Sequence, residues 1–489
     1  MSAVNTAAID RIVNASLKAW KVPGVAVAIV SGDEVYLQGY GIRELGGSDP
    51  VTPDTLFAIA SVSKAFTTTA MAMLVEEGKL DWEDHPRKHI PFFKLSDPVA
   101  DSAITVRDLV CHRTGMPRHD WLWYGSSWDR AEIVRRYCLA KPAYSFRGKY
   151  EYANVPFMAA GLVVGAASGG TWEDFARSRI FEPLGMETAN FSAEVSQASP
   201  NHCSPHEKFK GKMTVVPWCK MEEICPGGGI SASARDMSKW IRFHLANGEF
   251  EGNRLIAEEK LMETRKPQVV VPNENPDKYG FDSGMNIAAY CLGWQVHDYR
   301  GRIVTDHGGY IDGFTSRLSL VPSEKLGIMV LANTTDGPIA QSLSRSLLDE
   351  LLGLPFIDWT ARHKAQAKAQ KEEAKAKKAE EQEKGPKRHP RTKPSRELAA
   401  YAGDYEDPAY GTLKIAAPDH ALHLSYNMIS DIKLTHYHFD TFTAKFEEPG
   451  INAKVKLAFT LDADGEVASV NVVDPVQAEF AKVAPLRQT

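Results

Sequence analysis

The chain has 489 residues, a formal net charge of −5, and 43% hydrophobic and 24% charged residues. This length is enough for two or three domains with large cores, and the composition is that of a globular protein. The slightly acidic balance argues against a polyanionic partner, and no stretch approaches the roughly 20 apolar residues of a membrane span. Neither a nucleic acid nor a membrane is therefore an expected partner.

The first segments predict a helix followed by a pair of strands. Met1 to Trp20 carries apolar side chains at helical spacing with charged residues between them, which is typical of a helix packed on a sheet and not of a secretion signal. Val25 to Val30 and Glu34 to Arg43 read as strands joined by a short turn. The six cysteines are scattered without a Cys-x-x-Cys pair. This predicts reduced thiols, no metal site and a cytoplasmic location.

Ser61-Val62-Ser63-Lys64 places a hydroxyl and an amine three residues apart, at the expected start of a helix. Residues i and i+3 share a helix face, so Lys64 can reach the Ser61 hydroxyl. A lysine can take the serine proton if its surroundings lower its pKa from about 10.4 toward neutral. Ser-x-x-Lys is therefore a minimal acyl-transfer site. Taken alone, the tetrapeptide favours a simpler interpretation, a capped helix with an exposed lysine, and further motifs reverse that preference.

Residues from about 85 to 250 are expected to be mostly helical. Leu109 to Pro117 looks like a helix end with a glycine cap and a proline stop, so we give His112 a structural role, as a buried hydrogen-bonded histidine. Two interpretations of the aromatic residues that follow stay open: a pocket wall for a bulky group, or the core of the helical region. These residues are Trp121, Trp123, Tyr124, Trp128, Tyr137, Tyr144 and Phe146.

Tyr152-Ala153-Asn154 is the second chemical motif. Two residues apart on an extended or turning segment, the tyrosine and the asparagine point the same way. The phenol can shuttle a proton if nearby ammonium groups lower its pKa from about 10, and the amide can hold both Lys64 and a substrate carbonyl. The alternative is a helix start, with Asn154 as its cap and Tyr152 in the core.

His307-Gly308-Gly309 is the third motif, placed between the expected strands Arg302 to Val304 and Ser316 to Val321. Glycines beside a histidine on a strand let a ligand approach the backbone closely; the alternative is a tight loop with an ordinary histidine. Another strand and a helix from about Ile339 to Leu352 follow. Strands at both ends with helices between them predict an α+β fold: one antiparallel sheet flanked by helices, with residues 85–250 inserted as a second lobe.

In order and spacing, these motifs resemble the serine β-lactamase and penicillin-binding-protein superfamily. The similarity is to the class C-like branch, which includes DD-carboxypeptidases, D-aminopeptidases, carboxylesterases and acyltransferases. Pro226 to Met237 matches the glycine turn and following helix of that branch, and Tyr290 to Trp294 matches its strand before the glycine motif. The resemblance covers roughly residues 5 to 355. It implies a β-lactamase/transpeptidase-like catalytic domain over residues 1–360, with its site in the cleft between the sheet and the helical lobe.

The resemblance also implies roles for the motif residues. Ser61 attacks an ester or amide carbonyl, Lys64 with Tyr152 takes the serine proton and relays it to the leaving group, and Asn154 orients Lys64 and the substrate. By analogy of position, the backbone N–H groups of Ser61 and Tyr310 form an oxyanion hole. No cofactor and no metal is implied.

His307, Gly308 and Gly309 are expected to line the substrate pocket, and here the chain departs from many relatives. β-Lactamases and many carboxypeptidases carry Lys-Thr-Gly at this place, whereas related esterases and aminopeptidases commonly carry a histidine. Loss of the lysine weakens binding of the carboxylate that penicillins present. The resemblance therefore implies a weak β-lactamase at most.

The expected function is that of a serine hydrolase acting through an acyl-enzyme on a small ester or on an amide such as a D-amino-acid or peptide substrate. Two alternatives stay open. One is an acyltransferase of the same family, which passes the acyl group to an amine or alcohol. The other is a slowly deacylating penicillin-binding or sensor protein.

The C-terminal part changes character twice. Residues 361–395 include an Ala-, Lys-, Glu- and Gln-rich run, which predicts a charged helical linker and not a nucleic-acid patch. Residues 396–489 show short strands of period two between turn signals, which predict a small all-β barrel. Their opening tyrosine and glycine motifs resemble a lipocalin-like module that follows many catalytic domains of this branch. Three roles stay open for this module: a wall of the cleft, a homo-oligomer contact or a stabilising appendage.

Overall fold

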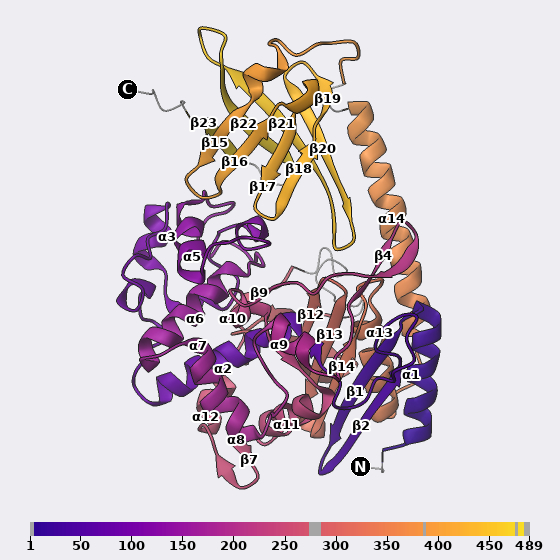
Figure 1. Ribbon diagram of the computed structural model, residues 1–489. Coiled ribbons are helices and arrows are strands. Elements are labelled where there is room, and N and C mark those ends of the chain that lie inside the picture. The colour runs from indigo at the N-terminus through magenta and orange to yellow at the C-terminus, as the bar shows by residue number, and fades with distance from the viewer. Residues whose placement is uncertain (1–3, 273–284, 385–387, 475–477, 484–489) are drawn as a thin grey trace. The chain divides into compact units, whose positions relative to one another are not determined.

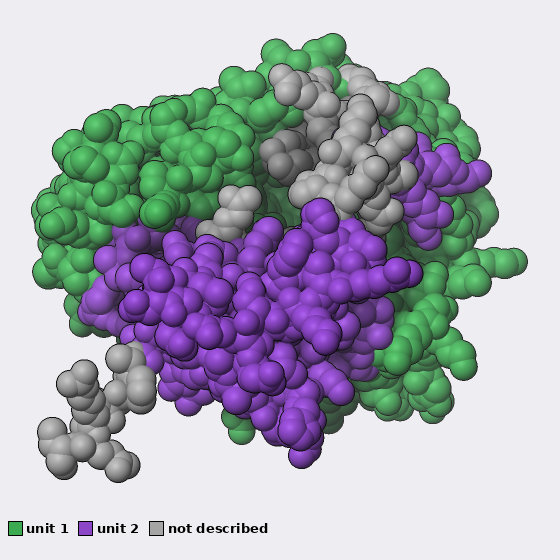
Figure 2. Space-filling view, turned by 90° about the horizontal axis from the view of Figure 1, so that it is seen from above, with its two compact units in different colours: residues 1–118, 141–367 green, residues 119–140, 368–489 purple. Residues whose placement is uncertain are grey.

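The computed structural model describes residues 4–272, 285–384, 388–474 and 478–483 (Figure 1). The chain divides into two compact units, coloured separately in Figure 2. Unit 1 holds residues 1–118 and 141–367, and unit 2 holds residues 119–140 and 368–489. A short stretch of the expected helical region therefore belongs to the same unit as the C-terminal residues.

Unit 1 is built on an eight-stranded antiparallel sheet, with strand order β2-β1-β14-β13-β12-β11-β10-β9. The N-terminal strand β1 pairs with β14, and Val25 lies opposite Ala332, so segments from near both ends of unit 1 lie side by side in the sheet. This confirms the predicted fold class. The strands are β1 (Gly24–Ser31), β2 (Glu34–Gly41), β9 (Val269–Val270), β10 (Ala288–Tyr290), β11 (Gln295–Tyr299), β12 (Arg302–Ile311), β13 (Phe314–Val321) and β14 (Leu326–Ala332).

Helices cover both faces of the central strands. On one face, α1 (Thr6–Trp20) and α13 (Ile339–Leu351) pack together, and Ile9 and Leu343 join a buried cluster with alternate residues of β1. On the other face lies α11 (Ala234–Leu245), whose Ile241 approaches the backbone of β14. Because both faces are covered, β1 is buried along nearly its whole length, which explains its almost uninterrupted apolar sequence.

Between β2 and β9 the chain forms the helical lobe (Figure 1). Helix α2 is buried on nearly every side and packs against α6, α10 and α12, so it carries apolar or small residues all round. The lobe helices of unit 1 are α2 (Lys64–Glu76), α3 (Pro98–Ala103), α4 (Val106–Leu109), α6 (Val155–Ser168), α7 (Trp172–Ala176), α8 (Glu182–Leu184), α9 (Ala193–Ala198), α10 (Cys225–Gly228) and α12 (Glu258–Glu263).

Short strand pairs interrupt the lobe, which sequence periodicity did not predict. They are β3 (Phe57–Ala58) with β6 (Ser231–Ala232), β4 (His206–Phe209) with β5 (Lys212–Val215), and β7 (Glu249–Phe250) with β8 (Asn253–Arg254). Among the described residues, no single helix has the length and hydropathy to cross a membrane. One pair, Val155–Ser168 with Trp172–Leu184, meets the criterion jointly but is bent by 75°.

In unit 2, nine antiparallel strands form a nearly closed barrel with order β18-β17-β16-β15-β23-β22-β21-β20-β19. The alternating run from Ile432 to His436 predicts a single strand, which is wrong: the run is divided between β18 and β19, which lie at opposite ends of this order. The strands are β15 (Gly403–Asp407), β16 (Gly411–Ala416), β17 (His423–Tyr426), β18 (Ile429–Lys433), β19 (Thr435–His438), β20 (Thr441–Glu448), β21 (Ile451–Leu461), β22 (Val467–Asp474) and β23 (Ala478–Lys482). The charged run before them forms helix α14 (Trp359–Lys384).

Segment 119–140, which contains α5 (Arg130–Leu139), packs within unit 2. The His119 ring is hydrogen-bonded to the Tyr410 hydroxyl, and the Asn427 amide donates to the Trp121 carbonyl over 3.0 Å. Trp121 also lines an apolar cavity of about 50 Å³ with residues of the barrel. Most of the aromatic run thus belongs with the barrel, an arrangement that neither sequence interpretation anticipated; Tyr144 and Phe146 lie in unit 1.

Candidate active site

Ser61 lies in unit 1 on a tight turn between β3 and α2. Ala60, the residue before it, has φ +47, in the left-handed region that a residue with a Cβ adopts at an energetic cost. A single 3-10 turn, Ala60–Ser63, then leads into α2, which begins at Lys64 and not at Ser61. This turn leaves Ser61 partly exposed at the wall of a cavity of about 530 Å³.

Lys64 is completely buried and is surrounded by three acceptors. Its Nζ donates to Ser61 Oγ at 3.1 Å, to Asn154 Oδ1 at 2.8 Å and to the Gly227 carbonyl at 2.5 Å. An ammonium has three donors, so this environment satisfies it fully. Nζ also lies 4.9 Å from the centre of the Tyr152 ring. The predicted approach of Lys64 to Ser61 is therefore present, and Gly227 is a partner that sequence reasoning did not identify.

Tyr152 and Asn154 reach the same place from an irregular segment before α6. The Tyr152 hydroxyl donates to Ser61 Oγ at 2.8 Å. Asn154 occupies the N-cap position of α6, but its side chain makes no capping hydrogen bond and instead accepts from Lys64. The structure thus brings together Ser61, Lys64, Tyr152 and Asn154, whose side chains form one hydrogen-bonded group.

His307 lies on β12 with only 2% of its surface exposed. Its Nδ1 lies 2.7 Å from the Gly308 carbonyl, which can only accept, so Nδ1 carries the proton and Nε2 accepts from the Tyr290 hydroxyl at 3.0 Å. Burial, reinforced by the nearby charge of Lys64, lowers the pKa of His307 to about 3. His307 is therefore neutral and supplies no positive charge where Lys-Thr-Gly relatives have a lysine.

Gly309 allows β12 to approach the turn that carries the nucleophile. A Cβ at this position would lie 2.2 Å from the Ile59 carbonyl oxygen and 2.2 Å from Ser316 Oγ. The Ser316 hydroxyl donates to that same carbonyl over 2.7 Å, which holds the chain before Ser61 against the sheet. Only glycine fits this close approach. Gly308, Gly309 and Tyr310 line the same cavity as Ser61; the oxyanion role of the Ser61 and Tyr310 N–H groups stays a prediction.

Charged side chains that no motif indicated also line the cavity. Arg317 is paired with buried Asp306, and the guanidinium of Arg118 lies 5.5 Å from the centre of the Tyr152 ring. Within the described part of the chain, the carboxylate of Glu151 has neither an ion pair nor a hydrogen bond. Isolated charged residues carry no local pattern, so only the fold identifies them as pocket residues.

Family models match both parts of this chain. The family model described as Beta-lactamase matches residues 9–352, and a domain of unknown function, DUF3471, matches residues 387–484. The chain is 28% identical over 499 aligned positions to Unguisins hydrolase ungD of Aspergillus violaceofuscus, covering 95% of this chain and 87% of that protein. It is 26% identical to Protein flp of Staphylococcus aureus strain MW2, covering 66% of this chain and 62% of that protein.

Solved structures show the same fold. An octameric penicillin-binding protein homologue from Pyrococcus abyssi aligns with a TM-score of 0.63 at 20% identity, over 98% of this chain and all of that one. D-Amino acid amidase from Ochrobactrum anthropi aligns with a TM-score of 0.57 at 23% identity, over 71% of this chain and 97% of that one. Since the family model spans well over half of the sequence and includes the whole hydrogen-bonded group around Ser61, this chain belongs to the Beta-lactamase family.

Proposed function

We propose that the protein is a serine hydrolase that forms an acyl-enzyme on Ser61 and cleaves amides of small amino-acid or peptide substrates. The observation that carries the proposal is the pair of hydrogen bonds from Lys64 Nζ and the Tyr152 hydroxyl to Ser61 Oγ, at the wall of a cavity of about 530 Å³. The amide preference is supported by the names of similar proteins, a D-stereospecific amidohydrolase from Streptomyces and the D-amino acid amidase.

Ser61 is activated when one of two groups, the Lys64 ammonium or the Tyr152 phenol, has lost a proton. Burial of Lys64 disfavours its ammonium, whereas an ammonium beside the ring favours the phenolate. Either group then accepts the Ser61 proton as Oγ bonds to the substrate carbonyl carbon. The same proton passes to the leaving amine as the C–N bond breaks. Water adds to the acyl-enzyme by the reverse proton path, and Ser61 Oγ leaves protonated.

Apart from Arg118, the charged and titratable groups around the cavity favour a substrate that does not depend on a carboxylate. His307 is neutral, and the Arg317 charge is balanced by Asp306. The carboxylate of Glu151, which has no ion-pair partner among the described residues, lies next in sequence to Tyr152 and attracts a positively charged group instead. An amide with a free amino group fits this arrangement better than a penicillin does.

The proposal is tested by intact-mass analysis after exposure to a fluorophosphonate probe, beside a Ser61→Ala control. D-Alanine p-nitroanilide and p-nitrophenyl esters are assayed in parallel. We expect one adduct, lost in the variant, and turnover of the anilide. An unlabelled protein without turnover would contradict the acyl-enzyme proposal. Turnover of esters alone would identify esters, and not amides, as the substrate class.

Two other outcomes distinguish the alternatives within the family. Transfer of the acyl group to an added amine, in preference to water, would identify an acyltransferase. A penicillin adduct that persists for hours without turnover would identify a slowly deacylating sensor.

A further inference from the structure

His112 holds the backbone on both sides of Tyr152. Its carbonyl accepts from the Glu151 N–H at 2.8 Å, and its Nδ1 accepts from the Ala153 N–H at 3.2 Å. Its ring lies 4.2 Å from the phenol ring, centre to centre, at an angle of 36°. One residue therefore fixes both neighbours of Tyr152 and contacts the phenol itself.

Tyr152 needs such support because residues 151–153 belong to no helix or strand. Without a ladder of regular hydrogen bonds, the position of its hydroxyl depends on contacts with other segments. Misplacement of a catalytic group by about 1 Å can lower the rate by about 10²-fold. The contacts made by His112 are therefore among those that fix the geometry of the 2.8 Å bond to Ser61.

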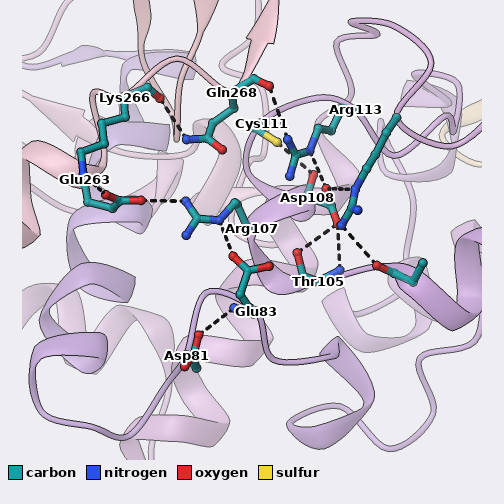
Figure 3. A network of polar contacts seen from close by, with 12 residues as sticks. Asp81, Glu83, Thr105, Arg107, Asp108, Cys111, Arg113, Glu263, Lys266 and Gln268 are labelled. Carbon is teal, nitrogen blue, oxygen red and sulfur yellow. Dashed lines mark hydrogen bonds and ion pairs between the residues drawn. The ribbon is translucent and has the colours of Figure 1, made fainter.

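The segment that carries His112 is itself held in a strained form. His112 has φ +59, in the left-handed region, and only 1% of its surface is exposed. Buried Asp108 accepts from Arg113 Nε at 2.5 Å, as Figure 3 shows. It also accepts from Arg147 Nη2 at 2.7 Å. The Arg147 N–H also donates to the Arg113 carbonyl over 2.9 Å. These contacts tie the chain around His112 to the chain that leads to Tyr152.

The protonation state of His112 agrees with a positioning role. Burial, together with the charge of Lys64, lowers the pKa of His112 well below its usual value, so the ring is neutral. Because Nδ1 accepts from Ala153, the proton lies on Nε2, which has no hydrogen-bond partner in the described structure. The ring is enclosed by Tyr150, Tyr290 and Phe157 and does not reach Ser61 as an acid or base.

We propose that His112 is a positioning residue that sets the Tyr152 hydroxyl at Ser61; this inference rests on the proposed acyl-enzyme function. It acts by three contacts: two hydrogen bonds to the residues beside Tyr152 and one ring contact. His112→Phe keeps an aromatic ring but removes the acceptor for the Ala153 N–H. His112→Asn removes the ring, tolerates the left-handed backbone, and offers an amide oxygen in place of Nδ1.

The test is a double-variant cycle in the full-length protein, with kcat, KM, the pH profile and thermal unfolding measured for each variant. We expect His112→Phe to lower kcat by about 10²-fold, with KM changed by less than about threefold. His112→Asn should recover about tenfold of that loss. In a Tyr152→Phe background, both substitutions should have little further effect, because their action passes through the missing hydroxyl.

His244→Asn is the matched control, since His244 is also fully buried and neutral but contacts Arg265 in the helical lobe. It should lower thermal stability and leave kcat unchanged. The positioning role would be overturned if the His112 substitutions lowered kcat as much in Tyr152→Phe as in the wild type. It would also be overturned if the decreases in kcat merely followed the decreases in unfolding temperature. If His112→Phe does not fold, the cycle with His112→Asn decides. An unlabelled, inactive wild-type protein would instead contradict the proposed function.

Discussion

Replacement of Tyr152 by phenylalanine removes one oxygen atom from the candidate site. That oxygen donates to Ser61 Oγ at 2.8 Å, whereas the ring contacts with Lys64 and His112, at 4.9 and 4.2 Å, remain. A positioned general acid–base group typically contributes about 10²–10⁴-fold to the rate. At 1.36 kcal/mol for each factor of ten, the activation free energy should rise by about 2.7–5.4 kcal/mol.

The assay compares kcat/KM and the rate of fluorophosphonate labelling in the wild type and Tyr152→Phe. The free energy of unfolding should change by less than about 1.5 kcal/mol, because loss of the hydrogen bond to Ser61 typically costs no more than this and the packing of the ring is retained. Tyr290→Phe is the matched control, because it removes a buried hydroxyl that is bonded to His307 and not to Ser61. Its kcat/KM should fall by less than about tenfold. If Tyr152→Phe is labelled and turns over at the wild-type rate, Tyr152 takes no part in the proton transfer.

Three further predictions follow from the same site. Gly309→Ala should lower both stability and the labelling rate, because its Cβ would lie 2.2 Å from the Ile59 carbonyl oxygen; unchanged unfolding and labelling would contradict the close approach. Glu151→Gln should raise KM about tenfold for an amide with a free amino group and leave KM for its N-acetyl analogue unchanged; equal effects on both would refute ammonium recognition. Folded His307 stays neutral down to about pH 3, whereas the unfolded chain protonates it below about pH 6.5. The free energy of unfolding should therefore fall as the pH decreases from 6.5 toward 3. Urea titrations at several pH values should show that this free energy depends less on pH in His307→Gln than in the wild type. An equal pH dependence would contradict a neutral His307.

Local geometry explains why part of the site was predictable. Ser61 and Lys64 are three residues apart across the single 3-10 turn that leads into α2, so their contact follows from local chain geometry. The strands near both ends of unit 1 and most of the barrel strands were also predictable, because alternating or apolar runs mark the chain locally. Helix α14 follows from its composition in the same way.

Packing decided the rest. Tyr152 and Gly227 reach Ser61 and Lys64 from far along the chain, and no local pattern encodes such an approach. Sequence could place a histidine in the glycine motif, but burial beside Lys64 makes His307 neutral. Segment 119–140 looked like part of the helical lobe and packs with the barrel instead. A sequence pattern reflects the geometry of residues that are close along the chain. Contacts between distant segments, the desolvation of a side chain and the packing partner of an aromatic ring arise only when the chain has packed.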